Sequence, residues 1–121
     1  ISASRVMLQS AFLDGAHLRL ADLTDSQLAG ASLVGVFLER STLDGADLRG
    51  ADLSGASLQF ASLRGADLRG AQLVGTLMNS ADLTGADLCG ANLSNASVEG
   101  TTWDDASACA DTRWPQQEPP L

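Results

Sequence analysis

The chain has 121 residues and a formal net charge of −8, with seven Arg and no Lys. This length provides for one domain, and the acidic balance argues against direct binding to nucleic acid, which needs a basic surface. No apolar run is long enough to span a membrane. The chain starts at Ile1 and not at Met, so a leader or further domain could precede it. The cytoplasm is the default expectation, and an exported compartment stays open.

A large apolar residue stands at every fifth position from Leu8 to Trp103. Seventeen of these twenty positions hold Leu, and the others hold Met78, Val98 and Trp103. The residue two positions earlier is small, and in fourteen units it is Ala; all twelve Gly come two positions after the large residue. Such a short, sustained period indicates a repeat architecture.

A period of five does not fit a helix. Each step of five residues would turn the Leu side chains by about 140° and leave no buried face. In an extended chain, residues two apart point the same way, so Ala46 and Leu48 can face inward while Asp47 and Arg49 face out. Gly50 then allows a positive φ and a corner. Each unit is therefore expected to form one short extended side and one corner.

The exceptions to the corner glycine predict how many sides make one coil. In the middle of the chain, the corner lacks Gly at Leu20, Arg40, Phe60 and Ser80, which are twenty residues apart. Four sides of five residues would then complete one coil. Twenty units would make about five coils, and about 4.8 Å per coil gives a rod of roughly 24 Å.

Units such as ADLRG, ADLSG, ADLTG and ANLSN resemble the A(D/N)LXX consensus of the pentapeptide-repeat proteins. The resemblance covers residues 6 to about 103. It implies an all-β fold, a right-handed quadrilateral parallel β-helix, with the Leu and the residue two before it inside. The family indicates the fold strongly and the function weakly.

The two ends differ from the middle. Phe12 stands at an outward position of the first coil, which predicts a cap or a docking place for preceding chain. Near the other end, the Leu series stops after Trp103. We expect Trp103 and Trp114 to close the last coil, since open coils expose core and strand edges. The expected division is a β-helix over 1–105 and a C-terminal cap with a polar, Pro-rich tail over 106–121.

Signals for catalysis are weak. His17 is the only histidine and occupies an outward position, and no second His or neighbouring Cys could form a dyad or zinc site with it. We therefore expect no enzyme, catalytic residue, cofactor or metal. Cys89 and Cys109 are one coil apart and could stack, but the Leu series ends before 109. Two free thiols are the expectation, with a disulfide as the alternative.

Stacking by twenty predicts four outward faces. One face alternates a column of Asp with a column of Arg, so that opposite charges offset each other. Another is strongly acidic, and its carboxylates belong to Asp22, Asp25, Asp44, Asp82, Asp104 and Asp105.

A third face carries large apolar residues where other units have polar residues or Gly. These are Leu20, Phe37, Phe60 and Leu77. A contiguous apolar patch with a polar rim predicts a contact surface. The alternative is that these side chains lie flat over the rod and only adjust the turns.

The function expected from these features is a non-enzymatic protein–protein interaction module or scaffold with an unidentified protein partner, and a homodimer is possible. One alternative is a DNA-mimicking inhibitor of a topoisomerase such as gyrase, as some members of the family are. In its favour is the acidic surface. Against it, those members are longer and use Phe within the repeat. Another alternative is an accessory repeat domain of a larger protein.

Overall fold

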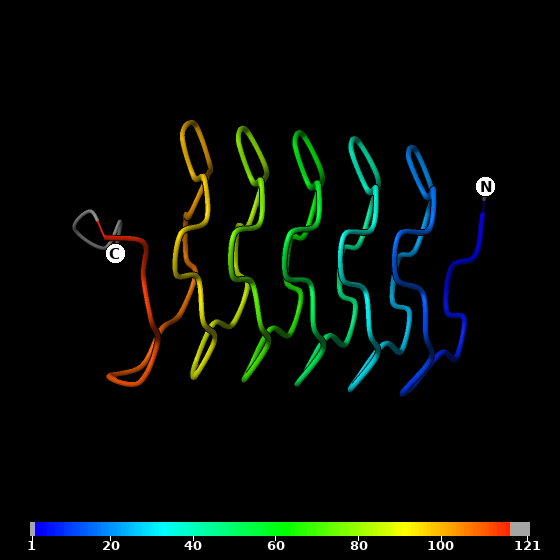
Figure 1. Ribbon diagram of the computed structural model, residues 1–121, viewed down its shortest axis with the longest axis horizontal. Helices are drawn as coiled ribbons and strands as arrows, with labels where there is room; N and C mark the ends of the chain where they lie inside the picture. Colours follow the sequence, from blue (N-terminus) through cyan, green and yellow to red (C-terminus); the bar gives the residue numbers. More distant parts are fainter. Residues whose placement is uncertain (1, 117–121) are drawn as a thin grey trace.

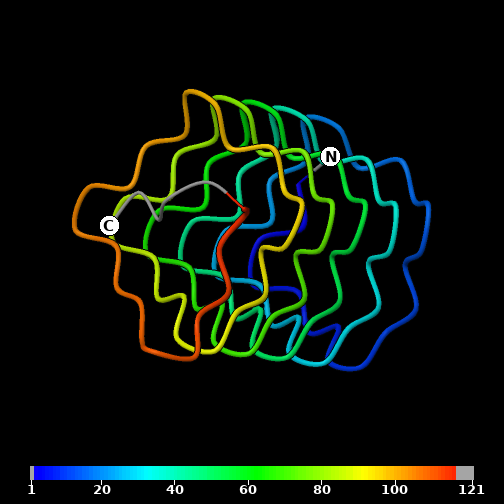
Figure 2. The ribbon, with the colours of Figure 1, turned by 60° about the vertical axis from the view of Figure 1, so that its left-hand side comes forward.

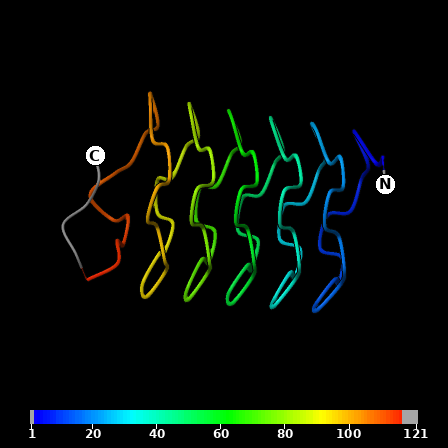
Figure 3. The same cartoon turned by 90° about the horizontal axis from the view of Figure 1, so that it is seen from above.

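The computed structural model describes residues 2–116 (Figure 1). Within this range the chain forms neither helices nor strands longer than one residue. Instead, one residue of each unit forms a parallel β-bridge to the residue twenty positions later, from Ser2 with Asp22 to Asp87 with Ser107. The coils lie side by side from one terminus to the other in two perpendicular views (Figures 1 and 3). The molecule is thus a rod whose repeating coil has twenty residues.

Every fifth residue forms a corner. All twelve Gly have φ between 64° and 74°, and nine other residues from Arg5 to Asp105 adopt the same left-handed conformation at this position. Each turn is closed by a backbone hydrogen bond, such as the one from Ala46 N to Leu43 O at 3.0 Å. Positive φ at the third residue is typical of a type II turn. Four corners in twenty residues give the four-sided outline visible along the rod (Figure 2).

Most backbone N–H groups donate hydrogen bonds to a neighbouring coil. In the unit 46–50, the N–H groups of Asp47, Leu48 and Gly50 donate to carbonyl oxygens of neighbouring coils. The N–H of Ala46 donates the bond that closes the preceding corner. The remaining N–H, that of Arg49, donates to Asp47 Oδ1 at 3.2 Å. The Asp before the Leu therefore accepts from the one donor that has no backbone partner. This gives a physical reason for Asp or Asn at that position.

The interior is a stack of Leu and Ala. From Leu23 to Leu93, each inward large residue is at most 4% exposed. Where a small polar residue replaces Ala, its hydroxyl donates to a carbonyl oxygen: Ser41 Oγ to Leu38 O at 2.6 Å, and Thr76 Oγ1 to Leu53 O at 2.9 Å. The inside and outside positions predicted from the sequence are confirmed.

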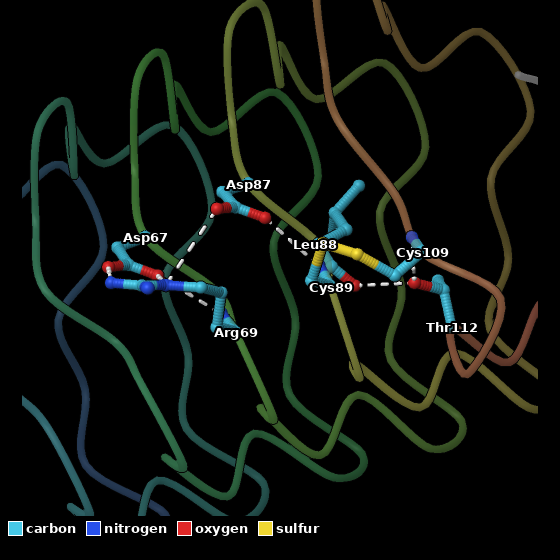
Figure 4. Close-up of a disulfide and its surroundings, with 7 residues drawn as sticks. All are labelled: Asp67, Arg69, Asp87, Leu88, Cys89, Cys109 and Thr112. Atoms are coloured by element: carbon cyan, nitrogen blue, oxygen red, sulfur yellow. Dashed lines mark hydrogen bonds and ion pairs between the residues drawn. A yellow bond between two sulfur atoms is a disulfide. The ribbon is translucent and has the colours of Figure 1, made fainter.

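Cys89 and Cys109 form a disulfide, so the expectation of two free thiols was wrong. Their Cα atoms are 4.7 Å apart, within the range that a disulfide spans. The pairing arises because the backbone keeps the twenty-residue register as far as Ser107, two residues before Cys109, although the Leu series has ended. Figure 4 shows this bond beside Thr112, whose hydroxyl donates to Leu88 O at 2.8 Å.

The register shifts by one residue between Ser107 and Cys109, since Thr112 N donates to Cys109 O where Ala91 N donates to Leu88 O one coil earlier. Asn92 bridges to Arg113, a separation of twenty-one, and Leu93 N donates to Arg113 O at 2.6 Å. Thr112 and Trp114 then take the inward positions of the final side. The coil therefore continues past residue 105, the expected boundary of the β-helix. The tail residues 117–121 lie outside the described residues.

Leu53→Ala should lower the free energy of unfolding by about 2–5 kcal/mol, because Leu53 is fully buried and the substitution leaves a cavity. Leu77→Ala, at a side chain that is 38% exposed, should cost less than about 1 kcal/mol. Urea unfolding of both variants measures the difference. Equal losses would contradict the inward and outward assignment near Met78.

Reduction of the disulfide should loosen the last coil. A cross-link closing a loop of this size contributes up to about 3 kcal/mol by restricting the unfolded chain. Hydrogen exchange should accelerate in residues 106–116 on adding a dithiol reductant and stay unchanged in residues 46–65. A Cys89→Ser, Cys109→Ser variant should exchange like the reduced protein with or without reductant. Unchanged exchange in residues 106–116 would show that the bond contributes nothing to the last coil.

Candidate functional site: the outer faces of the rod

The four residues predicted to form an interface lie on one face of the rod. We call it the apolar face; its five levels are residues 16–20, 36–40, 56–60, 76–80 and 96–100. The stack arranges its outward side chains in three columns along the rod, with one residue of each column at every level.

The first column contains two of the predicted residues. Parallel bridges order it as His17, Phe37, Ser57, Leu77 and Ser97. Phe37 is 37% exposed and Leu77 is 38% exposed, and Ser57 separates them. The His17 ring stacks on the Phe37 ring, with centroids 4.8 Å apart and planes 3° apart. Sequence reasoning treated His17 as an isolated surface residue and missed this contact, for which the twenty-residue spacing was the available signal.

The second column lies at the corner and contains the other two predicted interface residues. Leu20 is 68% exposed and Phe60 is 55% exposed, and Arg40 stands between them. The Arg40 guanidinium carbon lies 4.6 Å from the centre of the Phe60 ring, a cation–π contact. The four apolar residues thus share a face, but Ser57 and Arg40 interrupt the patch that the sequence predicted as contiguous.

This corner is conformationally strained. Leu20, Arg40, Phe60 and Ser80 have φ of 62°, 57°, 60° and 62°, although none is Gly. A left-handed conformation costs such residues roughly 1–2 kcal/mol each. The other non-Gly corners are at Arg5, Ser10, Asp25, Asn95 and Asp105, in the first or last two coils. Only the apolar face has side chains at four consecutive corners of its stack.

The third column is polar and incompletely hydrogen-bonded. It consists of Arg19, Glu39, Gln59, Asn79 and Glu99. Arg19 Nε pairs with Glu39 Oε2 at 3.1 Å. Glu39 Oε1 and Gln59 Oε1 are buried without a hydrogen-bond partner in the described part of the chain. No Asp precedes the inward residue on this face, so no carboxylate within residues 2–116 accepts from the five N–H groups of the column.

The apolar face is electrically neutral. Its charged side chains are Arg19 and Arg40 against Glu39 and Glu99, so its formal charge is zero on a chain of net charge −8. The charge of the rod is therefore concentrated on the other faces.

The acidic face contains the six predicted carboxylates, and some of them accept hydrogen bonds from backbone N–H groups. Asp22 and Asp82 accept from the hydroxyls and N–H groups of Thr24 and Thr84. These bonds hold the pKa of both carboxyls below the ordinary value of 3.8. Asp44 Oδ1 accepts from Arg64 N at 3.0 Å. Asp25, Asp104 and Asp105 complete the group at corner or end positions.

The face next to the acidic one carries a ladder of ion pairs, as the sequence predicted. Arg49 pairs with Asp47 at 2.6 Å and reaches Asp67 at 3.8 Å. Arg69 repeats the pattern, pairing with Asp67 at 2.5 Å and reaching Asp87 at 3.7 Å (Figure 4). The hydrogen bonds from Arg49 and Arg69 lower the pKa of Asp47 and Asp67. The two Arg offset two of the three Asp charges, so the ladder has a formal charge of −1.

The predicted caps behave differently. Trp103 and Trp114 are half-buried, pack on the interior and meet edge to face, with centroids 5.5 Å apart. Phe12 is 88% exposed and does not pack on the interior. Within residues 2–116 it therefore covers no core, and its role as a docking place for other chain remains a prediction.

Among the described residues, no three His, Cys, Asp or Glu side chains are grouped so that they could hold a metal ion. The part of the chain that the structure describes also contains no helix with the length and hydropathy of a membrane span.

The fold and its sequence pattern together define a pentapeptide-repeat β-helix. A family model described as pentapeptide repeats matches eight copies over residues 4–40, 21–59, 38–70 and 66–102. The chain belongs to the pentapeptide-repeat family. Comparison with curated protein sequences gave no significant match.

Solved structures of the family resemble this one. Rfr23 from the cyanobacterium Cyanothece 51142 is 34% identical, with a TM-score of 0.76 over 77% of this chain and 63% of its own. A protein of the Arabidopsis thaliana thylakoid lumen is 29% identical, with a TM-score of 0.66 over 78% of this chain and 62% of its own. HetL from Nostoc, involved in regulating heterocyst differentiation, is 26% identical, with a TM-score of 0.50 over 91% of this chain and 70% of its own.

These structures imply that the coil is a right-handed quadrilateral β-helix. The chain spans less than two thirds of the length of the first two.

The ladder makes stability depend on pH. Because the pKa of folded Asp47 and Asp67 lies below 3.8, their contribution is present above about pH 4 and is lost as the pH falls through the folded value. Urea unfolding of an Asp47→Asn, Asp67→Asn variant should show a smaller loss between pH 6 and pH 3 than the wild type. The exposed pairs limit the difference to less than about 1 kcal/mol.

Asn preserves the backbone acceptor in this experiment, as Asn92 does for Ser94 N at 3.0 Å. The variant therefore removes the titrating charge and keeps the hydrogen bond to the following residue. Equal losses in the two proteins would show that the ladder does not contribute to the pH dependence.

Proposed function

We propose that this protein is a non-enzymatic protein–protein interaction module or scaffold. In this proposal a rigid rod of about five coils presents its apolar face to a protein partner and holds an acidic face beside it. The ends, with Trp103 and Trp114 closing one of them, keep the rod intact and take no part in chemistry.

The strained corner is the observation that supports this function best. Glycine occupies most interior corners of the other faces without strain, yet Leu20, Arg40, Phe60 and Ser80 stand at consecutive corners of one face. Side chains in sparsely populated backbone conformations cluster at functional sites. Two of the four, Leu20 and Phe60, are large and apolar and more than half exposed, so burial within the rod offsets little of their strain. Contact with a partner supplies the missing stabilisation.

Charge and hydrogen bonding favour the same face. A protein that approaches the apolar face meets no net charge, whereas one that approaches the acidic face meets six carboxylates against Arg64. Aromatic side chains such as Phe37 and Phe60 are typical anchors of interfaces. The unpaired N–H groups beside them provide donors for polar contacts at the rim.

DNA mimicry remains the second candidate, because the acidic face concentrates negative charge on one side of a straight rod. Against it, Asp82 is paired with Arg64 at 3.1 Å, and Asp22, Asp44 and Asp82 already accept hydrogen bonds from Thr24, Arg64 and Thr84. A topoisomerase supercoiling assay separates the two functions: an interaction module leaves supercoiling unchanged. Inhibition that is lost when Asp25, Asp104 and Asp105 are changed to Asn would establish the mimic instead. An accessory domain of a larger protein remains compatible with the first proposal.

The Cys89–Cys109 disulfide bears on where the protein works. Structural disulfides persist in oxidising compartments and are rare where thiols are kept reduced. We therefore propose an oxidising compartment, to be tested by thiol labelling of the protein taken directly from its native cells. Labelling of both cysteines without added reductant would contradict this location.

Phe37→Asp, Phe60→Asp should keep the fold and abolish partner binding. Asp is already used at the position of Phe37, as in Asp47, and at corners, as in Asp25 with φ of 57°. The measurement is affinity capture with purified wild-type and variant protein, followed by binding of the captured partner in purified form.

The matched control is Val34→Asp, Val74→Asp, which adds the same two charges to a different face; Val34 is 39% exposed. It should bind like the wild type. A partner that binds the Phe37, Phe60 variant as tightly as the wild type would overturn the proposal, provided that both unfold at the same temperature.

A further inference from the structure

We infer that the partner which fits the apolar face is a second copy of this chain, bound face to face with the two rods antiparallel. The inference rests on the proposed function of this face as a contact surface and adds the identity and orientation of the partner. The two-fold axis crosses the face at the middle level, that of Ser57, Gln59 and Phe60.

Each column of the face is complementary to itself when it is reversed. An isologous interface brings residue i against residue j and j against i. With the axis at Ser57, the first column places Phe37 of one copy opposite Leu77 of the other, and the reverse. His17 meets Ser97, and Ser57 meets Ser57. In the corner column Phe60 meets Phe60. Phe37, Phe60 and Leu77 thus come together near the centre of the interface, where anchors are normally found, while Leu20 lies at its edge opposite Gly100.

The charges match in the same arrangement. Reversal brings Arg19, at the first level, opposite Glu99 at the fifth. The level of Arg19 has no acidic side chain, and the level of Glu99 has no basic one. Two parallel rods would instead bring Arg19 beside Arg19 and Glu99 beside Glu99. Like charges at one level disfavour that orientation.

The neutral face is also the one that lets two copies approach. Each rod has a net charge of −8, so contact through the acidic faces would oppose carboxylates. Contact through the apolar faces opposes surfaces of zero formal charge and leaves the acidic side chains away from the interface. Charge therefore selects this face for self-association.

The unpaired acceptors lie at the centre of the same arrangement. In the third column, Gln59 meets Gln59, and Glu39 meets the amide of Asn79. Glu39 Oε1 and Gln59 Oε1 have no partner among the described residues. The terminal torsion of Glu and Gln is soft. Rotation about it turns these oxygens toward the amide groups of the second copy, which can donate to them.

The interface is small. Its five levels extend over about 19 Å at strand spacing, which places it at the low end of interface sizes. Self-association should therefore depend on concentration over the micromolar range and above. Sedimentation velocity of the purified, disulfide-intact protein should show a monomer at low concentration and a dimer at high concentration. Phe37→Asp, Phe60→Asp should remain monomeric throughout, and Val34→Asp, Val74→Asp should follow the wild type.

Cysteine cross-linking tests the orientation. Ser57→Cys should give a covalent dimer with a short bismaleimide, because Ser57 is opposite itself. Ser62→Cys, a Ser at the same repeat position on the acidic face, is the matched control and should not. His17→Cys mixed with Ser97→Cys should cross-link between the two proteins, whereas each alone should not.

The outcomes separate this inference from the proposed function. A wild-type protein that stays monomeric at every concentration overturns the inference, as does a Ser57→Cys protein that cross-links no better than Ser62→Cys. Cross-linking of His17→Cys or Ser97→Cys alone overturns the antiparallel arrangement. The wild-type protein could instead be monomeric and bind a different purified protein, with this binding lost in the Phe37→Asp, Phe60→Asp variant. In that case the proposed function stands, and only the inference that the partner is a second copy is wrong.

Discussion

Backbone hydrogen bonds between residues one coil apart determine the position of every side chain in this protein. Three of the five N–H groups in a unit such as 46–50 reach neighbouring coils, and a shift of one residue would turn the inward Leu to the outside. The register also fixes which outward side chains are neighbours, because residues twenty apart stack at strand spacing. The buried interior, the ion-pair ladder, the disulfide and the apolar face all follow from it.

Most of the fold could be predicted from the sequence because each local requirement has its own residue type. Leu and Ala indicate the interior, Gly indicates the corner, and the exceptions at Leu20, Arg40, Phe60 and Ser80 indicate the length of the coil. The end of the rod could not be predicted in this way. The Leu series stops after Trp103, but the hydrogen-bond register continues to Ser107, and the extra residue lies between Ser107 and Cys109. Composition alone does not locate such an insertion.

The sequence predicted which residues belong to the candidate site, but not the contacts that these residues make. Twenty-residue stacking placed Leu20, Phe37, Phe60 and Leu77 on one face, as the structure does. It did not show that Ser57 and Arg40 divide them, that His17 stacks on Phe37, or that Glu39 and Gln59 each have an unpaired buried oxygen. Those features depend on side-chain conformations and on which backbone donors lack an acceptor. In physical terms, the five-residue period builds the rod, and departures from it that recur every twenty residues distinguish one face.

We propose that contacts with a partner or a second copy gather on the apolar face. The most direct test of this proposal is a map of backbone amide NMR shifts in the isotope-labelled protein as its concentration is raised or a purified partner is added. The reporters are the amides that no carboxylate caps on the apolar face, those of Arg19, Glu39, Gln59, Asn79 and Glu99. We expect these to shift while the capped amides of Thr24, Arg64 and Thr84 on the acidic face stay in place. Shifts that are largest on the acidic face, or equal on all four faces, would contradict the account.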